Sequence, residues 1–135
     1  MGYTIEEIEG IGPTYGEKLK AAGITNTDHF LKFCCDKKGR AGIAGKTGLS
    51  ESNLLKWANM ADLMRINGVA RQYSELLEAA GVDTVKELRT RRADNLSAKM
   101  AEVNVEKKLT KAVPNEAEVQ KWIDQAKSMD PLITH

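Results

Sequence analysis

A short glycine-containing turn near the N-terminus has the residue types and spacing of an anion-binding site. Gly10 and Gly12 flank Ile11, and Pro13 follows at a position where the first turn of a helix accepts proline. Glycine lets the backbone turn tightly, because no Cβ is in the way. We expect the amides of Ile11 and Gly12 to be unpaired within the following helix and to point outwards with the positive end of its dipole. Amides in that position can bind a phosphate.

The turn and the residues around it occur twice in the chain. Residues 8–23 return 58 positions later as residues 66–81, without a gap and with eight identities at matching positions. Residues 50–61 are also similar to residues 115–126. Each of these segments has a Lys-Trp pair at the same position, with Trp57 in the first and Trp122 in the second. This repetition predicts one domain, residues 1–135, built from two copies of one structural unit, residues 4–64 and 66–129, with a short C-terminal tail. We expect the two tryptophans to anchor the core.

The elements that position the turns are predicted to be helices. Apolar residues recur at spacings of three and four, and strand-like alternation is scarce. Thr4 with Glu7, and Thr84 with Glu87, have the spacing of capping boxes, and Gly23 is typical of a helix end. The sequence therefore predicts an all-α fold of about ten short helices. We expect the two units to pack about a pseudo-two-fold axis, each covering apolar faces of the other.

The pattern around the first turn resembles the helix-hairpin-helix motif. The residues that carry the resemblance are Ile5, Ile8, Gly10, Ile11, Gly12, Tyr15 and Leu19. In that family, amides of the hairpin contact a DNA phosphate without reading sequence, and paired motifs grip both strands across the minor groove. The resemblance implies contacts at Gly10, Ile11 and Gly12, with Lys18 nearby on the next helix.

The second copy departs from the motif at one position. Gly68, Val69 and Ala70 would supply the amides, but alanine replaces the second glycine and suits the turn only if its φ is negative. Arg65 and Arg71 flank this turn and would supply charge.

Nearly the whole chain is similar to an uncharacterised bacterial family of domains of unknown function built on tandem helix-hairpin-helix units. The similarity is carried by residues 8–13, 18–24, 47–50, 57–66, 76–88, 103–104 and 122–123. This resemblance implies the fold and the family, and it implies no activity.

The charge balance favours two different functions. The chain has 20 basic and 19 acidic residues, whereas proteins that coat nucleic acid are usually far more basic. Glu6, Glu7 and Glu9 also crowd the first turn and would repel a phosphate. The leading hypothesis is a non-catalytic module that binds DNA or RNA backbone without sequence specificity. The alternative is a protein-protein interaction or assembly module, in which the same turns only connect and pack helices.

Two further patterns are open to a nucleic-acid interpretation. Ala44, Gly48 and Leu54 have the spacing of a helix-turn-helix, although two packed helices joined by a tight turn explain them as well. Basic residues in the two linkers could form one positive face, or could lie on ordinary solvated helix faces. These residues are Lys37, Lys38, Arg40, Lys46, Arg89, Arg91, Arg92, Lys99, Lys107, Lys108 and Lys111.

Catalytic and metal-binding signatures are weak. His29 and His135 are the only histidines, and the adjacent cysteines Cys34 and Cys35 are poorly placed to bind one metal or to form a disulfide framework. We expect both cysteines on a buried helix face, and we expect no enzyme activity, cofactor, metal or small-molecule substrate. No apolar run approaches a membrane span and no signal peptide is evident, which predicts a cytoplasmic protein without a membrane partner.

Overall fold

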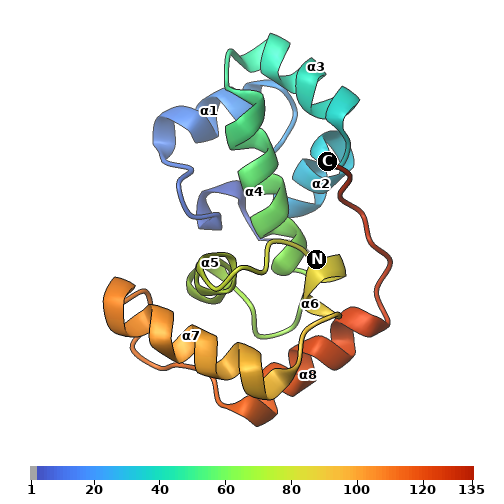
Figure 1. Cartoon of the computed structure of the whole chain (residues 1–135). Coiled ribbons are helices and arrows are strands. Elements are labelled where there is room, and N and C mark those ends of the chain that lie inside the picture. Colours follow the sequence, from blue (N-terminus) through green and yellow to red (C-terminus); the bar gives the residue numbers. More distant parts are fainter. Residues whose placement is uncertain (1–2) are drawn as a thin grey trace.

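The computed structural model describes residues 3–135, and within that range the chain is helical, with a single β-bridge between Thr4 and Asn26 (Figure 1). One 3₁₀ helix and eight α-helices follow one another in the order η1 (Ile5–Glu7), α1 (Pro13–Ala21), α2 (Thr27–Cys34), α3 (Lys37–Thr47), α4 (Glu51–Leu63), α5 (Arg71–Ala79), α6 (Val85–Leu88), α7 (Ala93–Lys107) and α8 (Glu116–Lys127). The all-α prediction is confirmed for this range, with nine helical elements in place of about ten. None of the helices described has the length and apolar character needed to cross a membrane.

Local sequence fixes where most helices begin and end. The capping box predicted at Thr4 and Glu7 is present, and the Thr4 amide donates to the Glu7 carboxylate at 3.0 Å. Pro13 occupies the first turn of α1, and Gly23, which has a φ of 89°, lies just after its end. The side chains of five other residues accept a hydrogen bond from the backbone amide three residues later, and these caps are Asn26, Asp36, Ser50, Thr84 and Asn115.

The apolar side chains form two clusters that meet at the end of α4. Phe30 and Trp57 belong to the first cluster, which is built by the elements from η1 to α4. Leu77 and Trp122 belong to the second cluster, which is built mainly by α5 to α8. Both tryptophans are buried, as expected of core anchors. Figure 1 shows the two groups of helices as an upper and a lower half, with α4 running down from the first group to the second.

Asp62 joins the two halves through a buried carboxylate. Its Oδ2 accepts from the Val85 amide at 2.8 Å, where α6 begins, and its Oδ1 accepts from Arg65 Nη1 at 2.7 Å. The carboxylate of Asp62 is almost fully buried and has lost its hydration. The ion pair with Arg65 compensates for this loss. The end of α4 is thereby fixed to the start of α6.

The C-terminal tail returns from the second half to the first, where the sequence predicted only a short appendage. Figure 1 shows it running from the end of α8 to the side of α2. Ile133 is buried in the first cluster. The Thr134 amide donates to the Cys35 carbonyl at 2.8 Å. The tail therefore completes the core of the first half.

Candidate nucleic-acid interface

The two predicted turns are closed by equivalent backbone hydrogen bonds. The Ile11 amide donates to the Ile8 carbonyl at 3.2 Å, and the Val69 amide donates to the Ile66 carbonyl at 3.1 Å. The side chains of Ile11 and Val69 are buried in the two clusters. The Ile11 amide is unpaired within α1, as expected, but the turn itself uses it, so it is not open to the phosphate contact predicted there. Ile11 and Val69 hold the turns in shape.

The first glycine of each turn has a structural reason of its own. Gly10 has a φ of 96° and Gly68 a φ of 93°, in the left-handed region that favours glycine. A Cβ at Gly10 would lie 3.2 Å from Nε1 of Trp57, and one at Gly68 would lie 3.3 Å from Nε1 of Trp122. Each turn therefore packs closely on the indole of its own half.

The residues that follow have amides open to a ligand. Gly12 and Ala70 are the N-caps of α1 and α5, with φ of −88° and −113°, and neither helix has a side-chain cap. Alanine is thus tolerated at the second position, because φ there is negative. Within residues 3–135, no acceptor is bound by the amides of Gly12, Thr14 and Tyr15 in the first copy, or of Ala70, Arg71, Gln72 and Tyr73 in the second. By contrast, five of the other six α-helices have a side-chain cap.

An exposed ion pair connects the two turns. Nε of Arg71, at the start of α5, donates to the carboxylate of Glu9 in the first turn, 62 residues earlier in the chain. This ion pair places the start of α5 within side-chain reach of the first turn. The sequence alone does not predict this neighbourhood.

The acidic side chains around the first turn all have partners. Glu6 pairs with Lys20, Glu7 accepts from the Thr4 amide, and Glu9 pairs with Arg71. The hydrogen bond from Lys20 lowers the pKa of the Glu6 carboxyl. The repulsion of a phosphate expected from these three residues is therefore reduced.

The three basic residues that the sequence placed beside the turns differ in their surroundings. Lys18 is exposed on α1 and forms no ion pair with the residues that the structure describes. Arg65 donates to Asp62 and to the Asp130 carbonyl, so its guanidinium has a structural role. Arg71 pairs with Glu9, but this pair is exposed, and exposed pairs contribute little to stability.

One cation near the second turn was not singled out from the sequence as part of the site. The Thr110 hydroxyl lies 3.5 Å from Oε1 of Gln72, and the Tyr73 hydroxyl donates to the Ala112 carbonyl at 2.9 Å. Residues 110–112 therefore lie against the first turn of α5, and the exposed Lys111 lies between these two contacts. The basic composition of this linker was visible in the sequence, but its contact with α5 was not.

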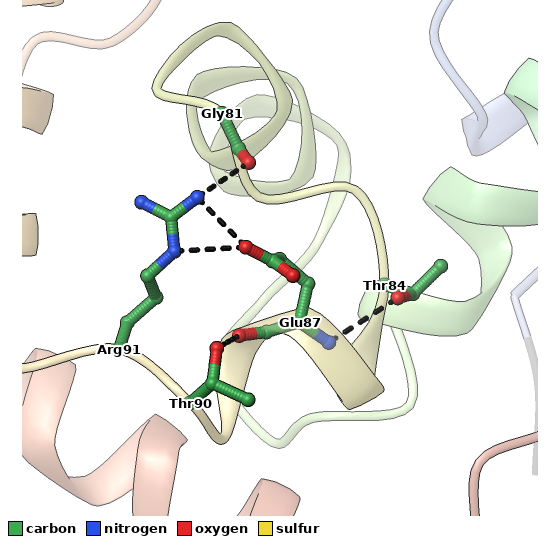
Figure 2. Close-up of polar contacts among 5 residues, drawn as sticks. All are labelled: Gly81, Thr84, Glu87, Thr90 and Arg91. Atoms are coloured by element: carbon green, nitrogen blue, oxygen red, sulfur yellow. Dashed lines mark hydrogen bonds and ion pairs between the residues drawn. The ribbon is translucent and has the colours of Figure 1, made fainter.

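Several residues of the predicted basic clusters are buried or already form hydrogen bonds or ion pairs with other residues of the protein. Arg91 binds Oε1 of Glu87 through Nε and Nη2, and the Gly81 carbonyl through Nη2 (Figure 2). Of the capping box predicted here, only the bond from the Glu87 amide to Thr84 Oγ1, at 3.3 Å, is present, because the Glu87 carboxylate turns to Arg91 instead. Arg40 is buried and Arg92 pairs with Asp94.

The region with helix-turn-helix spacing forms a tight turn between α3 and α4. Gly48 ends α3 with a φ of 77°, Ser50 caps α4, and Leu54 is buried in the first cluster. These contacts suit two packed helices joined by a turn.

The two cysteines and His29, which the sequence analysis considered for catalysis or metal binding, pack or form hydrogen bonds within the protein. Cys34 is buried, and burial raises the pKa of its thiol to about 12. Cys35 is only half buried, which corrects the expectation that both cysteines lie on a buried face. Nδ1 of His29 lies 3.0 Å from the Thr25 hydroxyl. No group of three or more His, Cys, Asp or Glu residues in the described range could hold a metal.

The fold and the two turns define an all-helical domain with a pair of uncapped helix N-termini. Sequence comparison then gives the family: the chain belongs to the domain of unknown function DUF4332, whose family model matches residues 9–129. The match includes both turns and all eight α-helices. Neither a curated protein nor a solved structure matches the chain.

Proposed function

We propose that the protein is a non-catalytic helix-hairpin-helix module that binds the backbone of DNA or RNA without sequence specificity. The observation that carries the proposal is the ion pair between Glu9 and Arg71, which links the first turn to the start of α5; each turn leads into an α-helix without a side-chain cap. The cytoplasmic setting predicted from the sequence belongs to the same proposal.

Matching contacts in the two halves support tandem helix-hairpin-helix units, residues 4–64 and 66–129, about a pseudo-two-fold axis. The rings of Tyr15 and Trp57 lie 5.4 Å apart at 50°, and those of Tyr73 and Trp122 lie 5.3 Å apart at 51°. Each pair sits beside the glycine that begins its turn. The equivalent hydrogen bonds of the turns add to this agreement.

The chemistry of the proposed contact is that of a helix N-terminus. A phosphate oxygen would accept from the open amides of Gly12 and Thr14, and a second phosphate from those of Ala70 and Gln72. Lys18 and Lys111 would add positive charge beside the two turns. Backbone amides and lysines read phosphates and not bases, so the binding would be independent of sequence.

Arg71 links the two proposed contacts. Its pair with Glu9 is exposed on both sides, and such pairs are weak. The guanidinium has five N–H donors, so a phosphate that approaches the start of α5 can accept from Nη1 or Nη2 while Nε stays paired with Glu9. Bound nucleic acid would then occupy Arg71 while the turns keep their shape.

Fluorescence anisotropy of a labelled duplex and a labelled single strand tests the proposal. Binding should be measurable at about 50 mM salt and should weaken steeply towards about 200 mM salt. Gly12→Val is the informative variant, because a Cβ there meets no atom within 4 Å and its φ is negative. We expect it to weaken binding by about tenfold, which corresponds to one charge-assisted hydrogen bond.

Gly42→Val is the matched control, because Gly42 lies in α3 and a Cβ there also meets no atom within 4 Å. It should bind like the parent protein. If neither probe binds at low salt, or if Gly12→Val and Gly42→Val behave alike, the proposed contact is wrong.

A protein-interaction module on the same scaffold is the second candidate. It is favoured by the near-neutral charge and by apolar side chains exposed around the end of α7, where Val105 is 76% exposed and Val113 is 37% exposed. Sedimentation across a range of protein concentrations tests one form of it. Self-association that Val105→Lys removes, together with absence of duplex binding, would favour assembly over nucleic-acid binding.

A further inference from the structure

The connection from α7 to α8 is longer than the matching connection in the first half. Residues 48–50 join α3 to α4, whereas residues 108–115 join α7 to α8, and α7 has 15 residues against 11 in α3. From residue 107 to residue 115 the chain has three lysines and no acidic residue. The second half therefore carries a basic loop, residues 108–115, where the first half has a tight turn.

Side-chain hydrogen bonds hold this basic loop beside the start of α5. The side chain of Asn104, in α7, binds the backbone of Thr110 twice: Nδ2 donates to the carbonyl at 2.9 Å, and Oδ1 accepts from the amide at 3.0 Å. The Tyr73 hydroxyl, in the first turn of α5, donates to the Ala112 carbonyl at 2.9 Å. The Thr110 hydroxyl accepts from the Ala112 amide at 3.3 Å. These bonds give the loop a defined course next to the second turn.

Lys108, the first residue of the loop, has a backbone conformation that favours glycine. It ends α7 with a φ of 51°, and every other positive φ within residues 3–135 belongs to a glycine. The matching helix α3 ends at Gly48, with a φ of 77°. A residue with a Cβ is less stable than glycine in this conformation. A lysine at this position therefore lowers stability, which points to a function for its side chain.

Two lysines of the loop have no ion-pair partner. The side chains of Lys108 and Lys111 are exposed, and neither forms an ion pair within the described range. Lys107, the last residue of α7, differs from them. Burial raises the pKa of the Glu75 and Glu78 carboxyls in α5, and Lys107 is among the cations that oppose this rise. Lys108 and Lys111 are thus the lysines of this segment whose charges remain available to a polyanion.

We propose that the basic loop contacts a phosphate of its own when the second turn binds nucleic acid, and that Asn104 is the residue that positions the loop. This inference rests on the function proposed above and adds a third contact to the two turns. Lys108 and Lys111 would donate to phosphate oxygens of the backbone that lies along the start of α5. A lysine binds phosphate as a point charge, so the loop raises the affinity and its salt dependence without reading bases.

Fluorescence anisotropy with a labelled duplex tests the loop across about 50 to 200 mM salt. Lys108→Gly combined with Lys111→Gln removes both charges. We expect this double variant to bind roughly tenfold more weakly, with a slope of log K against log salt that is smaller by about 0.9 for each lysine. Lys37→Gln combined with Lys38→Gln removes the same charge from exposed positions at the start of α3 and should bind like the parent protein. If the two double variants behave alike, the proposal is wrong.

Lys108→Gly on its own separates binding from folding. Glycine suits the φ of this position, so the variant should unfold at a higher urea concentration than the parent protein. It should nevertheless bind the duplex more weakly, because one phosphate contact is lost. General damage to the fold would lower both quantities. A Lys108→Gly variant that is more stable and binds as tightly as the parent protein would contradict the role of this side chain.

The positioning role of Asn104 is tested by one substitution in two backgrounds. Asn104→Ala releases the loop but leaves every lysine in place, and in the parent protein it should weaken duplex binding by about threefold. In the double variant with Lys108→Gly and Lys111→Gln it should have no further effect on binding, because the loop then carries no charge to position. Its effect on unfolding by urea should appear in both backgrounds. Equal weakening of binding in both backgrounds would overturn the positioning role.

The outcomes also distinguish this inference from the function on which it rests. If the parent protein binds neither duplex nor single strand at low salt, the proposed function is wrong and the loop contact falls with it. If Gly12→Val weakens binding but the double lysine variant does not, the function stands and the loop contact is wrong. Labelled poly-L-glutamate represents an acidic protein segment. Binding of this polymer that requires Lys108 and Lys111, when duplex binding does not, would assign the loop to a protein partner and overturn the proposal.

Discussion

Nη2 of Arg40 donates to the Thr134 carbonyl at 2.7 Å and thereby joins α3 to the C-terminal tail. The same guanidinium donates through Nη1 to the Cys34 carbonyl at 3.0 Å, at the end of α2. Arg40 is only 3% exposed; its bond to Cys34 is buried and its bond to Thr134 is partly buried. A cation near the C-terminal end of a helix is also favoured by the helix dipole. Arg40 therefore connects three segments of the first half.

Arg40→Leu is expected to destabilise the protein by about 1–3 kcal/mol, because it leaves the buried Cys34 carbonyl and the partly buried Thr134 carbonyl without a charged donor. Urea unfolding measures this difference. Lys46→Leu is the control, because Lys46 is exposed on the same helix. If the two variants lose similar stability, Arg40 does not have the role assigned to it.

The tail should contribute to the stability of the first half through one side chain. Ile133 is buried in the first cluster, while its neighbour Leu132 is 40% exposed. Ile133→Ala should cost about 1–3 kcal/mol, and Leu132→Ala should cost less than about 0.5 kcal/mol. Urea unfolding gives the two values. Hydrogen exchange of the Thr134 amide, which donates to Cys35, should accelerate in Ile133→Ala alone. Equal exchange in both variants would mean that the tail is held without its apolar anchor.

The sequence alone predicts the features that depend on residues close together in the chain. The glycines, the proline of α1 and the cap at Thr4 act within a few residues, so their patterns are sufficient to place helix ends. The Thr84 cap is only half formed, because Arg91 competes for the carboxylate of Glu87. Such a competition depends on where the two side chains lie after folding. The tail contact and the Asp62 carboxylate depend on pairs far apart in the chain and leave no pattern in the sequence.

For the candidate site, the sequence predicted the positions of the two turns but not which of their amides are free. The repeat placed both turns correctly along the chain, but the Ile11 amide is used by the Ile8 carbonyl. The open amides therefore begin one residue later, at Gly12. The pair between Glu9 and Arg71, which connects the turns, required the folded structure.

The first glycine of each turn should be far less tolerant of substitution than the second. In Gly10→Ala and Gly68→Ala, alanine must adopt a left-handed φ and its Cβ lies close to an indole. Each substitution should therefore lower the free energy of unfolding by about 1–3 kcal/mol. Gly12→Ala, where φ is negative and the space is open, should leave stability within about 0.5 kcal/mol of the parent protein. Thermal or urea unfolding of the three variants measures this contrast. A Gly12→Ala variant as unstable as Gly10→Ala would contradict the structural roles of the two positions.

Cys34 should be unreactive in the folded protein. Burial raises the pKa of its thiol from 9.0 to about 12, so the reactive thiolate is rarer by about a thousandfold than in the unfolded chain at neutral pH. In a Cys35→Ser background, alkylation by iodoacetamide should be slow in buffer and rapid in urea. Between pH 9 and 12 the unfolded chain releases this proton while the folded chain keeps it, so the contribution of Cys34 lowers stability as the pH rises. Cys34→Ala should reduce this loss of stability across the same range. Rapid alkylation in buffer, or an unchanged pH dependence in Cys34→Ala, would contradict the buried, protonated thiol.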